Sequence, residues 1–211
     1  MPQIKVLQSQ FLCATSKLEH CPPMHLPEVV FLGRSNVGKS TLINKVLQQK
    51  IAKSSATPGK TQSAIFFETA WQLTHQTLKF HCIDLPGFGY AKVSKSLQQE
   101  WGVFLCDLLK SRTSIKLFLH LVDARHPNLA IDQEVGYFLD QLISPTQQVR
   151  QIYTKFDKLN ANQQHALWHK SPNFLATSLK TADLLPKFSS LEAIQRAIIE
   201  GLFGIKADEN A

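Results

Sequence analysis

The amino-acid sequence predicts an α/β protein with a doubly wound, mostly parallel sheet and helices on both faces. Short apolar runs alternate along the chain with longer segments whose apolar residues recur at helical spacing, and no internal repeat is present. The 211 residues are 44% hydrophobic, which is enough to fill a single core. The first apolar run leads into a glycine-rich segment and then into a helical pattern, as in a strand–loop–helix unit.

The first half of the chain contains three predicted strands and one helix. Glu28 to Leu32 has the continuous apolar character of a buried strand. The next two strands are separated by a polar turn around Gln72 to Gln76, so we expect them to form an antiparallel hairpin. The predicted segments are a strand at Glu28–Leu32, a helix from Lys39 to about Gln49, a polar loop at 51–63, and strands at Ile65–Glu68 and Thr77–Ile83.

The second half alternates helices with strands. A helix is predicted at Leu97–Lys110 because its apolar residues recur on one face. It is followed by a strand at Lys116–Asp123, a helix at about Ile131–Ile143, a strand at Gln148–Tyr153, a helix at about Ala161–Lys170, a strand at Phe174–Thr177 and a helix at about Ser190–Phe203. We therefore expect three layers built on a sheet of about six strands, of which one edge strand is antiparallel.

The same pattern predicts the domain boundaries. Residues 1–25 are predicted to be an N-terminal extension packed on or preceding the domain, residues 26–205 the domain, and residues 206–211 a polar tail. The longest nearly uninterrupted apolar stretch, Leu117 to Val122, is far below the roughly 18 to 20 residues of a membrane span. The N-terminus lacks the apolar core of a secretory signal. We expect a cytoplasmic protein with no membrane segment.

The cysteines predict neither a disulfide framework nor a standard zinc site. The four of them contain no C-x-x-C pair and are expected to be free thiols. A metal site could be imagined from nearby cysteines and histidines, but their spacing fits no common pattern. The residues of this disfavoured site are Cys13, His20, Cys21 and His25.

Positive charge is concentrated in one part of the chain. The formal net charge is +7, and residues 34–95 hold nine Lys or Arg residues against Glu68 and Asp84. The rest of the chain carries fourteen basic and fourteen acidic residues. A basic region can attract a polyanion such as nucleic acid, or it can be a solvated face partly neutralised by a bound nucleotide. Charge alone leaves both interpretations open.

The strongest motif is Gly33-Arg34-Ser35-Asn36-Val37-Gly38-Lys39-Ser40, which matches the phosphate-binding pattern G-x-x-x-x-G-K-[ST] between a predicted strand and a predicted helix. Glycines let backbone N–H groups approach phosphate oxygens, and the helix adds the positive end of its dipole. Lys39 is predicted to bridge the β- and γ-phosphates, and the Ser40 hydroxyl to ligate Mg²⁺. The predicted nucleotide-binding residues here are Gly33, Arg34, Ser35, Asn36, Val37, Gly38, Lys39, Ser40 and Thr41.

A second motif, Asp84-Leu85-Pro86-Gly87, follows the strand that ends at Ile83. Alone, D-x-x-G is common in turns. Its position one hairpin after the phosphate-binding segment places a carboxylate where the γ-phosphate and metal would lie. Asp84 is therefore predicted to be an outer partner of Mg²⁺, and the Gly87 N–H to contact the γ-phosphate.

A third motif, Thr154-Lys155-Phe156-Asp157, follows the strand that ends at Tyr153 and resembles the [N/T]-K-x-D element with which GTPases read the base. The two oxygens of Asp157 can accept the ring N–H and the exocyclic amine of guanine together, whereas adenine presents a different arrangement. Lys155 is predicted to pack along the base. Thr177 and Ser178 are predicted to close the base pocket. The three motifs together predict a GTP-binding switch protein that is a GTPase.

The chain resembles the EngB family of ribosome-biogenesis GTPases, within the larger group that contains the Era and Der GTPases. The resemblance covers residues 26 to about 203. It rests on the three motifs above, with the second continuing as Phe88-Gly89-Tyr90, and on two further segments. These are Thr57-Pro58-Gly59-Lys60-Thr61-Gln62 and Asp123-Ala124-Arg125-His126-Pro127.

The resemblance implies a small, monomeric, single-domain protein with a phosphate-loop GTPase fold that assists assembly of the large ribosomal subunit by binding it or its RNA. Thr61 matches the switch threonine that meets Mg²⁺ and the γ-phosphate, with Thr57 as the alternative. Asn36 matches the asparagine that helps to hold a potassium ion in related GTPases. The implied catalytic residues are Lys39, Thr61 and Gly87, the Mg²⁺ ligands are Ser40, Thr61 and Asp84, and Asn36 is a K⁺ ligand.

Phe88 occupies the position at which many GTPases carry a water-orienting glutamine. We therefore expect slow intrinsic hydrolysis that rises when a partner or a cation completes the site. Two alternatives remain. One is a weakly hydrolysing nucleotide-dependent scaffold that recruits a protein partner. The other is a small-molecule kinase, a function that would give the third motif, Thr154 to Asp157, no role. No catalytic role is assigned to His120, which is expected to be a core histidine with its polar atoms satisfied.

Overall fold

The computed structural model describes residues 3–52, 63–88, 95–170, 175–177 and 191–205. The elements in chain order are β1 (Ile4–Thr15), η1 (Leu18–His20), β2 (Glu28–Gly33), α1 (Lys39–Val46), β3 (Ala64–Leu73), β4 (Gln76–Asp84), α2 (Lys95–Ser111), β5 (Ile115–Asp123), α3 (Ala130–Leu142), β6 (Gln148–Thr154), η2 (Phe156–Lys158), α4 (Ala161–Lys170), β7 (Leu175–Ala176) and α5 (Leu191–Phe203).

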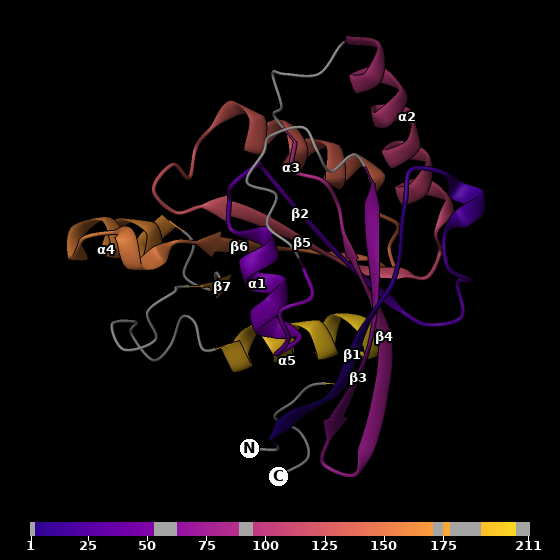
Figure 1. The fold of residues 1–211 in the computed structure, drawn as a ribbon. Coiled ribbons are helices and arrows are strands. Elements are labelled where there is room, and N and C mark those ends of the chain that lie inside the picture. The colour runs from indigo at the N-terminus through magenta and orange to yellow at the C-terminus, as the bar shows by residue number, and fades with distance from the viewer. Residues whose placement is uncertain (1–2, 53–62, 89–94, 171–174, 178–190, 206–211) are drawn as a thin grey trace.

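The strands form one sheet of seven with the order β1-β3-β4-β2-β5-β6-β7 (Figure 1). β3 pairs antiparallel with both of its neighbours, β1 and β4. All other neighbouring strands pair in parallel. The predicted α/β class with a mostly parallel sheet is confirmed.

The sheet differs from the prediction in two details. It has seven strands rather than six, and the antiparallel strand β3 lies second from the edge because β1 covers it. The alternation of apolar and polar residues in β1 is broken by two register shifts, between Val6 and Gln8 and between Phe11 and Cys13. A register shift moves side chains to the opposite face. The segment therefore carries no period-two pattern that would predict a strand.

Several element bounds also differ from the expected ones. β3 continues to Leu73, which pairs with Gln76, so the turn is confined to Thr74 and His75. Thr74 has a φ of 55°, a left-handed conformation found in tight turns. α1 ends at Val46, three residues before the predicted end.

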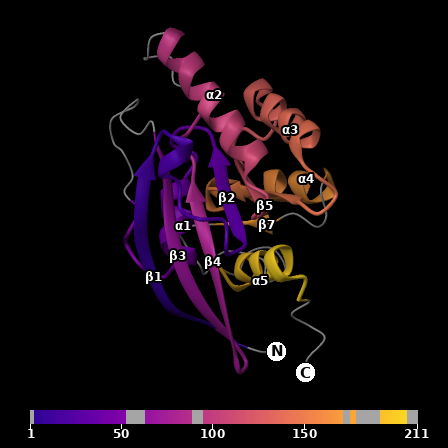
Figure 2. The ribbon, with the colours of Figure 1, turned by 90° about the vertical axis from the view of Figure 1, so that its right-hand side faces the viewer.

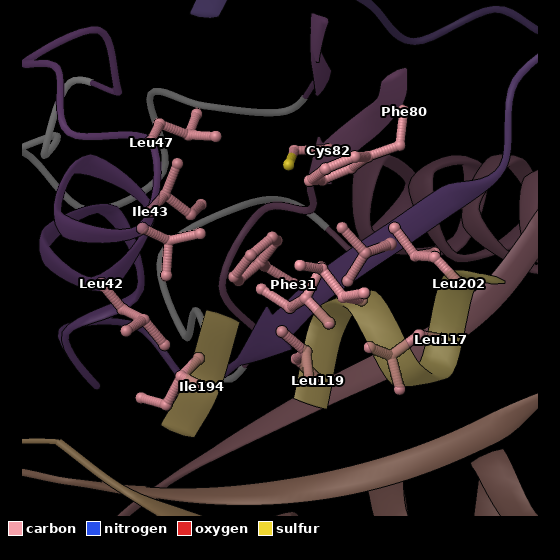
Figure 3. Packing of buried hydrophobic residues seen from close by; sticks show 14 of the residues in the cluster. Phe31, Leu42, Ile43, Leu47, Phe80, Cys82, Leu117, Leu119, Ile194 and Leu202 are labelled. Carbon is pink, nitrogen blue, oxygen red and sulfur yellow. The ribbon is translucent and has the colours of Figure 1, made fainter. Parts of the chain in front are cut away.

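One apolar layer lies between the sheet and helices α1 and α5. Phe31 of β2 is fully buried there between the two helices (Figure 3). Burying an aromatic or aliphatic side chain of this size contributes about 1.5–3 kcal/mol. Residues of this layer labelled in Figure 3 are Phe31, Leu42, Ile43, Leu47, Phe80, Cys82, Leu117, Leu119, Ile194 and Leu202.

A second apolar layer covers the other face of the sheet. Helices α2 and α3 lie next to each other and apart from α5 (Figure 2). Leu108 of α2 and Leu139 of α3 pack in one cluster with Phe66 and Phe118 of the sheet. None of the helices in the described ranges combines the length and the apolar character of a bilayer-spanning helix.

A buried ionic cluster fixes the amino end of β2. Glu28 is fully buried, and its carboxylate accepts hydrogen bonds from Arg112 Nε at 2.8 Å and Arg112 Nη2 at 2.5 Å. Ser114 Oγ donates to the same carboxylate at 2.8 Å, and His81 Nδ1 lies 3.3 Å from it. Burial alone would raise the pKa of Glu28, but the hydrogen bonds from Arg112, His81 and Ser114 hold it below its ordinary value. Glu28 is therefore ionised and paired.

We expect Arg112→Ala to lower the free energy of unfolding at pH 7 by about 3–5 kcal/mol, because it leaves the Glu28 carboxylate buried without its cation. Urea unfolding measures this value. The difference from wild type should shrink as the pH falls below the ordinary Glu28 value of 4.5, since a protonated carboxyl no longer requires a cation.

The matched control is Arg150→Ala, which removes an exposed arginine that lies 3.7 Å from Glu200. Its cost should stay within about 1 kcal/mol. Equal costs for the two substitutions would contradict a structural role of the buried pair.

Candidate functional site

The predicted phosphate-binding segment connects β2 directly to α1. β2 ends at Gly33, and α1 begins at Lys39, so the intervening backbone lies at the carboxyl end of a central parallel strand. Ligands of open α/β sheets bind at this position. Gly38 has a φ of 108°, a conformation that side chains rarely permit. The motif therefore adopts the strand–loop–helix geometry that it predicts.

Gly33 is required by a close approach between strands. A Cβ at this position would lie 2.7 Å from the carbonyl oxygen of Leu121 in β5. This backbone atom belongs to the ladder between β2 and β5, so it cannot move aside cheaply. The first glycine of the motif thus serves packing of the sheet, in addition to loop formation.

The predicted phosphate ligand and the predicted metal ligand are in contact. Lys39 Nζ donates to Asp84 Oδ1 across the end of the sheet. Burial raises the pKa of Asp84, and the nearby Lys39 ammonium opposes this rise. The structure therefore brings together the cation of the first motif and the carboxylate of the second.

The segment after Asp84 is docked on the phosphate-binding backbone. Phe88 N donates to the Gly33 carbonyl at 3.3 Å, and Phe88 O accepts from Ser35 N at 3.1 Å. A Cβ at Gly87 would lie 2.8 Å from both Cα and N of Ser35. Only glycine permits this approach, so Gly87 is required here by contact between two backbones.

The third motif is also bonded to the phosphate-binding backbone. Thr154 Oγ1 donates to the Val37 carbonyl at 2.6 Å, and Lys155 Nζ donates to the Asn36 carbonyl at 2.7 Å. Lys155 has a φ of 56°, which turns the chain sharply between β6 and η2. The residues of the third motif therefore lie beside those of the first, although 117 positions separate Thr154 from Val37.

Asp157 lies in η2 with a side chain that is only 2% exposed. Its carboxylate oxygen Oδ2 is 3.9 Å from Lys158 Nζ. Thr177 closes the same region through the backbone: its N–H donates to the Tyr153 carbonyl, and its own carbonyl accepts from Phe156 N. The geometry thus places Thr177 next to the third motif.

A pocket lies between the first and third motifs. α1 forms one wall of the pocket, and residues at the ends of β6 and β7 form the opposite wall. Its lining includes Thr41, which was predicted to bind nucleotide, and Lys45, for which no such role was predicted. Residues lining it include Gly38, Thr41, Lys45, Thr154, Lys155 and Thr177.

Asp123 is a site residue whose role the sequence did not reveal. Its carboxylate accepts from Arg125 Nε at 3.0 Å and Arg125 Nη2 at 2.8 Å, and from Lys155 Nζ at 3.0 Å. Burial would raise its pKa, but these hydrogen bonds hold the pKa of Asp123 well below its usual range. Asp123 is thus an ionised anchor that fixes Lys155.

Asp132 is a second residue missed by the sequence analysis. It lies in the first turn of α3, where it accepts a hydrogen bond from Arg34 Nε at 3.1 Å. Nothing in the spacing of its neighbours distinguishes it from an ordinary helix-starting acid. It ties the phosphate-binding segment to α3.

His120 does not have the satisfied environment that was expected. Its Nε2 and Asp132 Oδ1 are 4.0 Å apart, and both are buried without a hydrogen-bond partner among the described residues. Burial lowers the pKa of His120 to about 4, so its ring is neutral at pH 7. The ring of Phe88 lies 6.2 Å away, centroid to centroid.

Some predicted site residues lie outside the described residues. These are Thr61, its alternative Thr57, and Ser178. The serine hydroxyl of Ser40 and the carboxylate of Asp84 are oxygen donors, which is the ligand chemistry that Mg²⁺ prefers. The donor set of the site therefore fits the predicted ion.

Comparisons with known proteins agree with this geometry. A family model described as 50S ribosome-binding GTPase matches residues 28–155. The probable GTP-binding protein EngB of Helicobacter pylori strain Shi470 is 48% identical over 202 residues, which cover 94% of this chain and 97% of that protein. The protein of the same name from Helicobacter hepaticus is 53% identical over 167 residues, covering 79% of this chain and 75% of that one.

Solved structures share the fold. The crystal structure of a probable GTP-binding protein EngB superposes with a TM-score of 0.60 at 25% identity, covering 84% of this chain and all of that one. Era in complex with MgGDPNP and a 16S ribosomal RNA fragment superposes with a TM-score of 0.59 at 21% identity, covering 83% of this chain and 56% of that one. The predicted phosphate-loop GTPase fold is confirmed. The chain belongs to the EngB family of GTP-binding proteins and is a GTPase.

Proposed function

We propose that the chain is a GTP-dependent switch with slow intrinsic hydrolysis that acts in assembly of the large ribosomal subunit. One observation carries the switch: the backbone of residues 33–37 is bonded both to the segment after Asp84 and to the third motif. Phosphate and base recognition thus share one backbone. A ligand that displaces one of these contacts alters the others.

The phosphate end of the site is assigned to Lys39, Ser40 and Asp84. In this proposal Lys39 leaves Asp84 for the β- and γ-phosphates, while Asp84 and Ser40 hold Mg²⁺, together with Thr61. The metal supplies charge stabilisation to the phosphates. The Gly87 N–H is assigned to the γ-phosphate, because Gly87 already lies against the backbone of the phosphate-binding segment.

Slow hydrolysis follows in this proposal from Phe88. An aromatic ring cannot orient a water molecule by hydrogen bonding. His120, whose ring lies near that of Phe88, is uncharged at pH 7 and lies outside the phosphate-binding segment. A cation could supply the missing positive charge. Asn36 is the proposed potassium ligand; it has a left-handed φ of 59° within the phosphate-binding segment.

The base end is assigned to Asp157, with Lys155 packed along the base. Lys155 is held on the Asn36 carbonyl and the Asp123 carboxylate, so its stem has a fixed direction. Asp157 is nearly buried, which makes a mismatch with adenine costly. Thr177 and Ser178 complete the base pocket in this proposal.

We expect Asp157→Asn to reduce the preference for GTP over ATP by at least about 100-fold, because the amide cannot accept two hydrogen bonds from guanine. The variant should instead prefer xanthosine triphosphate over GTP, because the xanthine base has a carbonyl where guanine has its amine. Equilibrium titration with fluorescent GDP and competing nucleotides measures the preference. Asp140→Asn makes the same chemical change on the exposed face of α3 and should leave it unaltered. An unchanged preference in Asp157→Asn would remove the base assignment.

We expect replacement of Na⁺ by K⁺ to raise multiple-turnover phosphate release at least about tenfold, since a bound cation stabilises developing charge. Asn36→Gly removes the carboxamide but tolerates the left-handed backbone, and it should abolish the stimulation. Gln48→Gly makes a comparable change at another left-handed position, with a φ of 52°, and should retain it. Rapid hydrolysis by the purified wild type in Na⁺ would contradict slow turnover.

The ribosomal partner is supported by the description of the matched family and by the basic region. Part of this positive charge is neutralised by ion pairs, because Arg34 pairs with Asp132 and Lys39 pairs with Asp84. Lys50 and Lys79 are exposed. Exposed lysines of this kind contribute the salt-dependent attraction expected for an RNA partner.

Co-sedimentation with large ribosomal subunits tests this partner. We expect binding with a non-hydrolysable GTP analogue to exceed binding with GDP or without nucleotide by at least about tenfold, because only the γ-phosphate engages the Gly87 segment. Equal binding in the three states would contradict the switch. Phosphate release with subunits present distinguishes the alternative scaffold, which Phe88 favours: a scaffold shows nucleotide-dependent binding without stimulated turnover.

A further inference from the structure

A group of metal-ligating side chains lies outside the nucleotide site, at the amino end of β2. His25, in the segment before β2, meets Glu68 of β3 and His81 of β4. One ligand atom from each lies within 4.8 Å of the others. We propose that this His25–Glu68–His81 cluster binds a zinc-like divalent transition-metal ion.

His81 is oriented as a metal ligand. Its side chain is 1% exposed, and Nδ1 faces the Glu28 carboxylate at 3.3 Å. A carboxylate paired with Arg112 is a hydrogen-bond acceptor, so the geometry assigns Nδ1 as the donor and leaves Nε2 as the nitrogen available to a metal. Nε2 is buried and has no hydrogen-bond partner among the described residues. A carboxylate behind a histidine is the usual outer shell of a zinc ligand.

Glu68 supplies the negative charge. It pairs directly with His81 across the antiparallel β3–β4 ladder, so the two side chains leave the sheet on the same face. Its Oε1 accepts from Gln10 Nε2 at 3.1 Å, whereas Oε2 faces His81 Nε2 at 3.8 Å. The Arg112 cation nearby is already paired with Glu28.

His25 makes the cluster accessible and adjustable. It is exposed, and its ring stands perpendicular to that of His81 with centroids 5.5 Å apart. Ligand atoms of a tetrahedral zinc site lie roughly 3.3 to 3.6 Å apart. The exposed His25 and the partly exposed Glu68 can close this difference by side-chain rotation, while the buried His81 stays fixed.

The donor set selects the class of ion. Two imidazole nitrogens and one carboxylate oxygen suit Zn²⁺, Co²⁺ or Ni²⁺, whereas Mg²⁺ and Ca²⁺ prefer oxygen ligands alone. Three protein ligands leave one position for water or for a group of a partner. The site differs from the disfavoured cysteine-containing combination, because it joins His25 to the β3–β4 hairpin.

The test is a zinc titration of protein saturated with GDP and Mg²⁺, so that the nucleotide site is filled. Isothermal calorimetry with a competing chelator gives the stoichiometry and affinity. The variants are His25→Ala and Glu68→Gln, and the matched control is His75→Ala in the exposed turn of the same hairpin. We expect the first two to lose one equivalent of zinc, or to bind it more weakly by over tenfold, and the control to retain it.

Thermal unfolding supplies a second readout. Zinc should raise the melting temperature of wild type and His75→Ala more than that of His25→Ala, while all three melt alike in chelator. Zinc can also bind elsewhere, for example at His165 and His169, whose ring nitrogens are 3.2 Å apart on α4. Such binding persists in His25→Ala. Identical titrations of wild type and His25→Ala therefore overturn the proposal.

Discussion

The backbone of residues 33–37 is the constraint on which the rest of the site depends. Within five residues it accepts hydrogen bonds from Phe88, Lys155 and Thr154 and donates one from Ser35. These groups come from two strand ends, since Phe88 follows β4 and both Thr154 and Lys155 lie at the end of β6. Their positions relative to one another follow from a single loop, whose main-chain atoms bond the backbone of Phe88 and the side chains of Thr154 and Lys155.

Three cations of the site have a carboxylate partner. Lys39 contacts Asp84, Arg34 contacts Asp132, and Lys155 contacts Asp123. Pairing lowers the cost of burying charge and fixes the direction of each long side chain. In the proposed function, a nucleotide phosphate therefore competes with Asp84 for Lys39. Arg34 and Lys155, whose partners belong to α3 and β5, can remain in place while that exchange occurs.

The central strands and the three motifs could be predicted from the sequence because their signals are local. A buried parallel strand is a continuous apolar run, and each motif follows such a run directly. β1 could not be predicted, since its bulges break the alternation and its apolar residues Leu7 and Phe11 are exposed. Asp132 and the Glu28–Arg112 pair could not be predicted either. Their partners are 98 and 84 positions away, and single charged residues carry no spacing signal.

β2 explains why the proposed switch would act through the loops around it. All six of its residues are buried, and the ionic cluster at Glu28 fixes its amino end while Gly33 packs against Leu121 at its carboxyl end. The start of the phosphate-binding segment therefore cannot shift without disrupting the sheet. The segment from Leu85 to Phe88 is attached to residues 33–35 mainly through two backbone hydrogen bonds, of 3.1 and 3.3 Å. In the proposed switch, a γ-phosphate contact that offsets these two bonds releases Phe88 from residues 33–35, because the free energy of each bond is only about 0.5–1.5 kcal/mol.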